Sequence, residues 1–120
     1  MKLQESTENY LETILMLSRS GRHVRSVDVA NELDFSRPSV SVAMKKLRES
    51  DMIEIDSDGF ISLTKNGYEI ANSMYERHTL ISNWLISLGV NEKTALDDAC
   101  RIEHVISEES FLAIKKAAEA

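Results

Sequence analysis

A thiol, a carboxylate and an imidazole lie close together in a C-terminal segment with a helical pattern. They belong to Cys100, Glu103 and His104. In an α-helix, the spacings i, i+3 and i+4 place side chains on one face. We therefore expect the three groups to lie together, beside a buried stripe of alanine and isoleucine. Such groups bind divalent cations of intermediate softness, so the segment is a candidate metal site.

A simpler interpretation of the same residues stays open at this point. Glu103 and His104 would be solvated surface groups, and Cys100 would be a small buried hydrophobe, as free cysteines often are. The helix alone does not decide between the two. The choice depends on what the rest of the chain is built to do.

The length and composition of the chain limit its class. Its 120 residues suit one compact domain, or a small module with an appended dimerisation segment. The net charge of −6 argues against a polybasic coat for nucleic acid but leaves room for a local basic patch. A single cysteine forms no internal disulfide, and no apolar run reaches membrane-spanning length. We therefore expect a cytoplasmic protein with no membrane partner.

The first half of the chain has the order of a winged helix-turn-helix. Ser26 is expected to cap a short helix over Val27–Leu33, and Pro38 suits the first turn of a longer helix from Arg37 to Ser50. Two runs of alternating apolar residues then flank Asp58-Gly59, which is a strong hairpin signal. Short helix, tight turn, longer helix and hairpin are the elements of a DNA-binding winged helix.

The remaining segments are helical. A capped helix from Ser6 opens the chain, and a long apolar helix after Thr64 ends at Gly89. Asn91 is expected to cap the helix that carries the cysteine, and Ser107 the last one. These helices carry more apolar surface than they can bury alone, so we expect a homodimer. The predicted fold is mainly α: a winged helix-turn-helix with a two-stranded wing (residues 1–68), then a helical metal-binding and dimerisation domain (69–120).

The longer helix of the winged part and the turn before it supply the candidate DNA contacts. Hydroxyl groups and an arginine at the helix start suit base edges and phosphates, and the later lysines suit phosphates. An ordinary solvated helix face is the alternative. The predicted DNA-binding residues are Ser36, Arg37, Pro38, Ser39, Ser41, Val42, Lys45 and Lys46.

Several motifs together resemble the diphtheria-toxin-repressor family of metal-dependent transcriptional regulators. They are Thr7–Ile14, Ser36–Ser41, Leu63–Gly67, Arg77-His78 and Ala99–Ser107. Each is modest alone, but their order is specific and covers almost the whole chain. The resemblance implies a homodimeric repressor of metal homeostasis genes that binds double-stranded operator DNA when Fe²⁺ or Mn²⁺ is loaded.

The resemblance also implies a ligand set. His78, Glu103 and His104 match ligands of both the iron and the manganese branch. Glu12 matches a ligand of the manganese branch, and Cys100 matches a ligand of the iron branch. Asn9 matches neither branch. Thiolate favours Fe²⁺ over Mn²⁺, which prefers hard oxygen ligands, so Fe²⁺ is expected first and Mn²⁺ second. Co²⁺, Ni²⁺ and Zn²⁺ are further candidates in vitro.

Two other functions remain to be separated from this one. A winged-helix regulator could ignore metal and respond to an organic ligand or to oxidation of Cys100. A small metalloenzyme could use Glu12 or Glu103 as a base, but no phosphate loop or nucleophile–base pair supports it. We therefore predict that the protein is not an enzyme.

Overall fold

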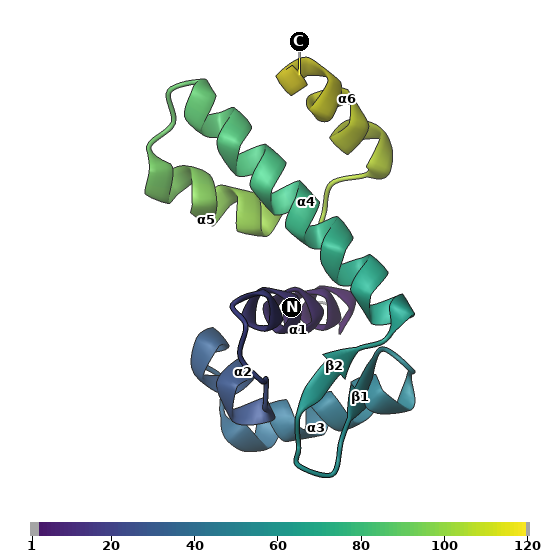
Figure 1. The fold of residues 1–120 in the computed structure, drawn as a ribbon. Coiled ribbons are helices and arrows are strands. Elements are labelled where there is room, and N and C mark those ends of the chain that lie inside the picture. Colours follow the sequence, from purple (N-terminus) through teal and green to yellow (C-terminus); the bar gives the residue numbers. More distant parts are fainter. Residues whose placement is uncertain (1–2, 120) are drawn as a thin grey trace. The chain divides into compact units, whose positions relative to one another are not determined.

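The computed structural model describes residues 3–119, in two compact units that meet between Asn72 and Ser73. Each unit is described by itself. The elements, in chain order, are α1 (Leu3–Arg19), α2 (Ser26–Leu33), α3 (Arg37–Glu49), β1 (Ile53–Ile55), β2 (Ile61–Leu63), α4 (Lys65–Ser87), α5 (Glu92–Ile102) and α6 (Glu108–Glu119). Helix α4 begins in the N-terminal unit and continues into the C-terminal one. The order confirms the mainly helical winged-helix fold predicted from the sequence (Figure 1).

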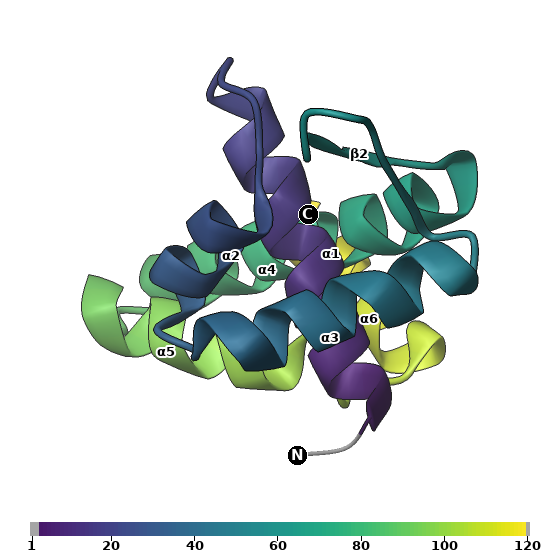
Figure 2. The same ribbon diagram turned by 90° about the horizontal axis from the view of Figure 1, so that it is seen from below.

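The helix-turn-helix forms as the sequence predicts. Helix α2 ends at Asp34, whose left-handed backbone (φ 56°) turns the chain. Ser36 then caps α3 by accepting a hydrogen bond from the Ser39 amide at 3.3 Å, and Pro38 lies in the first turn, where its missing N–H is not needed. Figure 2 shows α3 running from this turn to the hairpin.

One face of α3 builds the core of the N-terminal unit. Val40, Met44 and Leu47 are buried. They share this core with α1, whose Leu11 and Ile14 are fully buried. Burial of one face at helical spacing leaves the opposite face of α3 exposed.

The wing is a two-stranded antiparallel hairpin in which Ile53 pairs with Leu63 and Ile55 with Ile61. Its turn is closed by Asp56, whose Oδ1 accepts from the amides of Asp58 and Phe60, each at 2.9 Å. Gly59 has φ 84°, a conformation that favours glycine. The sequence signal for a hairpin is therefore confirmed.

The base of the wing is fixed to the first turn of α4. The Thr64 hydroxyl donates to the Asp51 carbonyl at 2.7 Å and accepts from the Gly67 amide at 3.2 Å. A Cβ added at Gly67 would lie 2.0 Å from the Met52 carbonyl oxygen. This contact is possible only with glycine at position 67.

The C-terminal unit packs the later part of α4 with α5 and α6. Its core contains Ile81, Ala99 and Phe111, one from each helix, with half-buried apolar side chains around them. The Asn91 side chain caps α5 by accepting from the Lys93 amide at 3.0 Å. The predicted cap of α5 is thus confirmed.

Several helix boundaries differ from the sequence prediction, including the end of α3, at Glu49 instead of Ser50. Helix α1 begins at Leu3, before the predicted start at Ser6. Helix α2 begins one residue early, with Arg25 at the cap position, because the Asp28 carboxylate accepts from the Arg25 amide at 2.9 Å. Helix α5 ends at Ile102, earlier than its sequence pattern indicates. No helix within residues 3–119 is long and apolar enough to cross a membrane.

Candidate metal centre and nucleic-acid interface

Glu103 lies just past the end of α5 and points into the protein. Its backbone N–H still donates to the Ala99 carbonyl at 2.9 Å, so it stands at the C-cap of the helix. None of its side chain is exposed to solvent, and its Oε1 lies 3.3 Å from Nδ1 of His78 on α4. The structure therefore brings together two of the predicted ligands from helices α4 and α5.

The second carboxylate oxygen of Glu103 is one of two buried side-chain atoms in the described residues that lack a hydrogen-bond partner; the other is Arg77 Nε. Oε2 is buried and has no hydrogen-bond partner among the described residues. A buried carboxylate is costly unless hydrogen bonds or a cation compensate its charge. His78 compensates one oxygen, and a metal ion bound at the other would supply the missing interaction.

His104 and Cys100 are less buried than Glu103. His104 follows Glu103 in a turn and is half-buried, and Cys100, on the last regular turn of α5, is exposed. The three groups therefore differ in burial, although Glu103 keeps a helical backbone at the C-cap: its side chain is fully buried, whereas Cys100 is exposed. The simpler interpretation, with Cys100 buried and Glu103 solvated, is wrong.

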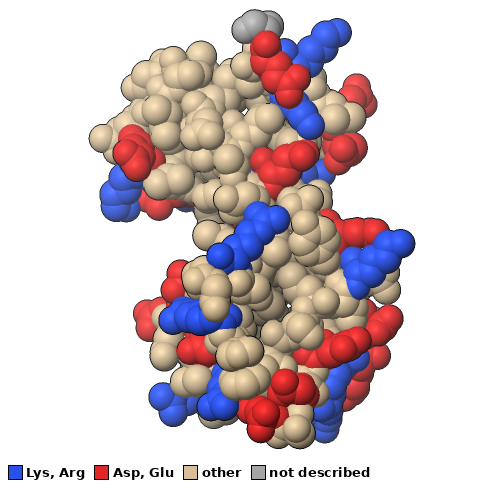
Figure 3. Space-filling view, viewed as in Figure 1, with Lys and Arg blue, Asp and Glu red and all other residues tan. Residues whose placement is uncertain are grey.

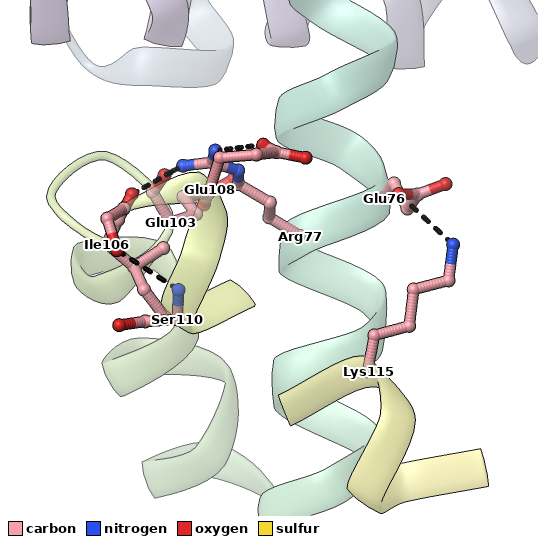
Figure 4. Close-up of polar contacts among 8 residues, drawn as sticks. Glu76, Arg77, Glu103, Ile106, Glu108, Ser110 and Lys115 are labelled. Atoms are coloured by element: carbon pink, nitrogen blue, oxygen red, sulfur yellow. Dashed lines mark hydrogen bonds and ion pairs between the residues drawn. The ribbon is translucent and has the colours of Figure 1, made fainter. Parts of the chain in front are cut away.

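The turn that carries Glu103 and His104 is held by a side chain that the sequence analysis did not single out as functional. Arg77, next to His78 on α4, donates from Nη1 to the carbonyls of Glu103 (3.2 Å) and Ile106 (2.8 Å) (Figure 4). An arginine directly before a predicted ligand histidine, in a heavily apolar helix, is the sequence signal that could have identified Arg77.

The two remaining predicted ligands lie on α1, in the N-terminal unit. Asn9 and Glu12 are three residues apart, which places them on one face of this helix. Glu12 is buried (7% exposed) and Asn9 is half-buried. Their part in a metal site stays a prediction from the sequence.

The predicted DNA-binding residues all lie on the exposed face of α3 and its preceding turn. Val42 is the most apolar of them and is 56% exposed. A cavity of about 260 Å³ separates α3 from the wing, and its lining includes Ser41, Lys45 and Arg48. A hydroxyl group and two cations facing this space suit a phosphate backbone.

Basic and acidic side chains both lie at the surface of the protein. Figure 3 shows basic and acidic side chains interspersed on the face it presents. This agrees with the net charge of −6. The net charge does not favour attraction to DNA, so the local cations of α3 remain candidate DNA contacts.

Comparison with protein-family models matches both halves of the chain. Residues 2–59 match the iron dependent repressor N-terminal DNA-binding domain. Residues 64–119 match the iron dependent repressor metal-binding and dimerisation domain. The two matched segments meet between residues 59 and 64, and the two compact units between residues 72 and 73.

Individual relatives include both metal branches. The transcriptional regulator MntR of Escherichia coli is 35% identical over 112 residues, which are 93% of this chain and 72% of MntR. The diphtheria toxin repressor of Corynebacterium diphtheriae is 31% identical over 108 residues, 89% of this chain and 48% of the repressor. The solved structure of the manganese regulator SloR has a TM-score of 0.83 and 29% identity, over 94% of this chain and 53% of SloR. The chain thus spans about half the length of the latter two.

Proposed function

The chain belongs to the iron-dependent repressor family of metal-dependent transcriptional regulators, which control metal homeostasis, and we propose that Fe²⁺ is the ion that activates its binding to an operator. Its relatives are DNA-binding regulators, not enzymes. The proposal concerns which residues hold the ion, which residues meet DNA and how two copies pair.

The observation that carries the metal site is the buried Glu103 carboxylate. One oxygen contacts His78 and the other has no partner in the described part of the chain. Glu103, His104 and His78 supply the oxygen and nitrogen ligands that both iron and manganese accept. A bound cation would neutralise Glu103 and stabilise the state that presents all the ligands. Asn9, Glu12 and Cys100 join this set on the resemblance of the sequence.

DNA recognition is assigned to the exposed face of α3. Arg37 and the hydroxyls of Ser39 and Ser41 lie at its N-terminal end, where a recognition helix meets base edges. Lys45 and Lys46 follow one turn later and suit phosphates. Ser36 and Pro38 fix the start of this helix.

Pairing of two copies is assigned to the C-terminal unit. Phe111 is used inside the unit, but Leu88 (64% exposed), Leu112 (51%) and Leu96 (40%) remain at its surface. Figure 3 shows an area without charged side chains over the end of α4. Exposed apolar area of this kind is typical of a surface that a second copy covers.

The choice of Fe²⁺ over Mn²⁺ rests on the Cys100 thiol. A thiolate ligand favours Fe²⁺ and the later metals, whereas Mn²⁺ has the lowest affinity of the series for such sites. Asn9 supports the same choice, because a neutral amide contributes less negative charge than the aspartate expected of the manganese branch. Mn²⁺ is the second candidate.

Titration of DNA binding with each metal tests this proposal. An operator would first be selected from random-sequence duplexes with the metal-loaded protein, and binding then titrated with Fe²⁺ and with Mn²⁺ under anaerobic, reducing conditions. We expect binding to require metal, with half-activation at lower Fe²⁺ than Mn²⁺. Binding that is unchanged by a chelator would favour a metal-independent regulator that senses an organic ligand or Cys100 oxidation.

A further inference from the structure

We infer that Arg77 is a positioning residue that holds the Glu103–Ile106 turn in the geometry required for metal binding, and that it connects this turn to helix α6. The inference rests on the proposed metal site. It assigns a role to a residue that is not itself a ligand.

The contacts of Arg77 converge on the turn. Its Nη1 donates to the Glu103 carbonyl at 3.2 Å and to the Ile106 carbonyl at 2.8 Å, the two ends of the turn that contains His104. Its Nη2 donates to Glu108 Oε2 at 3.0 Å, in the first turn of α6. One guanidinium therefore binds three acceptors on three successive parts of the chain (Figure 4).

The surroundings of Arg77 keep the guanidinium in place. Its side chain is only 12% exposed, and its Cζ lies 5.4 Å from the centre of the Phe111 ring, within the range of a cation–π contact. Hydrogen bonds that are shielded from water hold a geometry better than exposed ones do. The buried Nε has no partner among the described residues, so the two Nη atoms alone anchor the group.

Arg77 directly precedes His78 in α4, and both side chains contact Glu103. The next residue, His78, contacts the Glu103 carboxylate, while Arg77 binds the Glu103 carbonyl. Two consecutive side chains of one helix thus fix the side chain and the backbone of the same ligand. Groups that orient metal ligands typically change metal affinity by about 10–100-fold when removed.

Only arginine fits this role. Its planar fork presents several N–H groups in fixed directions, whereas a lysine ammonium is a single centre on a flexible stem. Lysine at position 77 would retain the positive charge near Glu108 but could not hold both carbonyls in the same way. Arg77→Lys is therefore a test of geometry with the charge preserved.

The structure also supplies a matched control. Glu76 and Lys115 join the same two helices, α4 and α6, by an ion pair of 3.7 Å that does not touch the turn (Figure 4). Glu76→Gln removes this neighbouring pair, one residue away from Arg77. It separates an effect on the α4–α6 connection from an effect on the ligand turn.

The experiment measures metal binding directly. Free Mn²⁺ would be counted by electron paramagnetic resonance, and Co²⁺ binding followed by its absorption spectrum, for wild type, Arg77→Met, Arg77→Lys, Glu108→Gln and Glu76→Gln. Amide hydrogen exchange at residues 104–107 of the metal-free proteins would report whether the turn has loosened. Operator affinity would be measured at saturating metal.

We expect Arg77→Met to weaken Mn²⁺ binding by about tenfold or more, to alter the Co²⁺ spectrum and to speed exchange in the turn. Operator affinity at saturating metal should be retained. The Mn²⁺ affinity of Arg77→Lys should lie between those of Arg77→Met and wild type. Glu108→Gln should reduce the Mn²⁺ affinity less, and Glu76→Gln should bind Mn²⁺ within about twofold of wild type. If Arg77→Met does not fold, the Mn²⁺ affinity of Arg77→Lys is compared with that of Glu76→Gln in its place.

Three contrary outcomes are distinguishable. Wild-type protein that binds neither ion would overturn the proposed metal site itself. Wild-type protein that binds metal, with Arg77→Lys and Arg77→Met binding as tightly, would overturn the positioning role and leave the metal site standing. Equal losses for Arg77→Lys and Glu76→Gln would show that only the α4–α6 connection matters, and would also overturn the inference.

Discussion

Nδ1 of His78 lies 3.3 Å from Oε1 of Glu103, although the two residues are 25 positions apart in the chain. The contact joins α4 to the end of α5 at a carboxylate that no solvent reaches. A surface ion pair would contribute little, but a buried carboxylate depends strongly on each partner. We therefore expect the pair to be the fixed part of the proposed metal site.

Replacing His104 with alanine should abolish metal-dependent DNA binding while the homodimer remains. The substitution removes a proposed ligand but leaves the apolar core of the C-terminal unit intact. Operator binding with and without metal, together with sedimentation of the protein, measures both effects. His23→Ala is the control, because His23 is exposed and stacks on Phe60 of the wing. Operator binding by His104→Ala that still requires added metal would place the site elsewhere.

Lys45→Ala should weaken operator binding and reduce its salt dependence. A lysine that contacts a phosphate releases about one counterion, so the slope of log affinity against log salt should fall by about one. Arg37→Ala should weaken binding as well. Affinities measured at several salt concentrations test both, with Lys93→Ala as a control whose side chain is 84% exposed on α5. A slope identical to wild type would remove Lys45 from the phosphate contacts.

Val42→Gln should change which base is preferred at one operator position. Val42 is exposed on α3 and can contact a thymine methyl group, whereas glutamine prefers to bond adenine. A change of this type corresponds to about 1–3 kcal/mol of discrimination. Selection of preferred sequences from a randomised operator, for wild type and variant in parallel, provides the measurement. Identical preferences would exclude Val42 from base recognition.

Cys100→Glu should increase the response to Mn²⁺ relative to Fe²⁺, and adding Asn9→Asp should increase it further. The first change replaces a soft thiolate by a hard carboxylate, and the second adds a negative charge. Half-activation of operator binding by each ion, for wild type, Cys100→Glu and the double variant, tests the order. A wild-type protein already activated better by Mn²⁺ would mean that Cys100 is not a ligand.

Gly67→Ala should destabilise the N-terminal unit. The added Cβ would lie 2.0 Å from the Met52 carbonyl oxygen, so either the wing or the first turn of α4 must move. Overpacking of this kind costs about 1–3 kcal/mol, to be measured by denaturant unfolding. Asn66→Ala, at the exposed neighbouring position, should stay within about 0.5 kcal/mol of wild type. Equal stability of the two variants would contradict the close contact.

Local sequence signals predicted most of the fold. Ser36 and Asn91 cap their helices, Pro38 lies in the first turn of α3, and Gly59 adopts the positive φ of the hairpin turn. Each of these features depends on the chemistry of a residue and its near neighbours. The winged-helix order could therefore be predicted without knowledge of tertiary contacts.

The metal-binding segment was harder to predict because helical spacing does not give the depth of each side chain. Periodicity treats Cys100, Glu103 and His104 as one face, and the backbone is still helical at Glu103, the C-cap of α5. Glu103 then enters the interior while Cys100 stays at the surface. The turn is held by contacts with His78 and Arg77 on α4, 25 and 26 positions away in the chain, which the periodicity of residues 99–107 does not reveal.

The unpartnered oxygen of Glu103 also bears on the lifetime of the protein. Local opening of the C-terminal unit would expose this carboxylate to water, which offers the hydrogen bonds that the folded state lacks. A cation that binds only the closed state opposes this opening, by about 2.7 kcal/mol at a concentration one hundred times its dissociation constant. Since proteases cleave opened chains, protein without metal should be degraded faster. Metal shortage would then lower the number of repressor molecules as well as their occupancy, and genes under its control would stay derepressed until new protein is made.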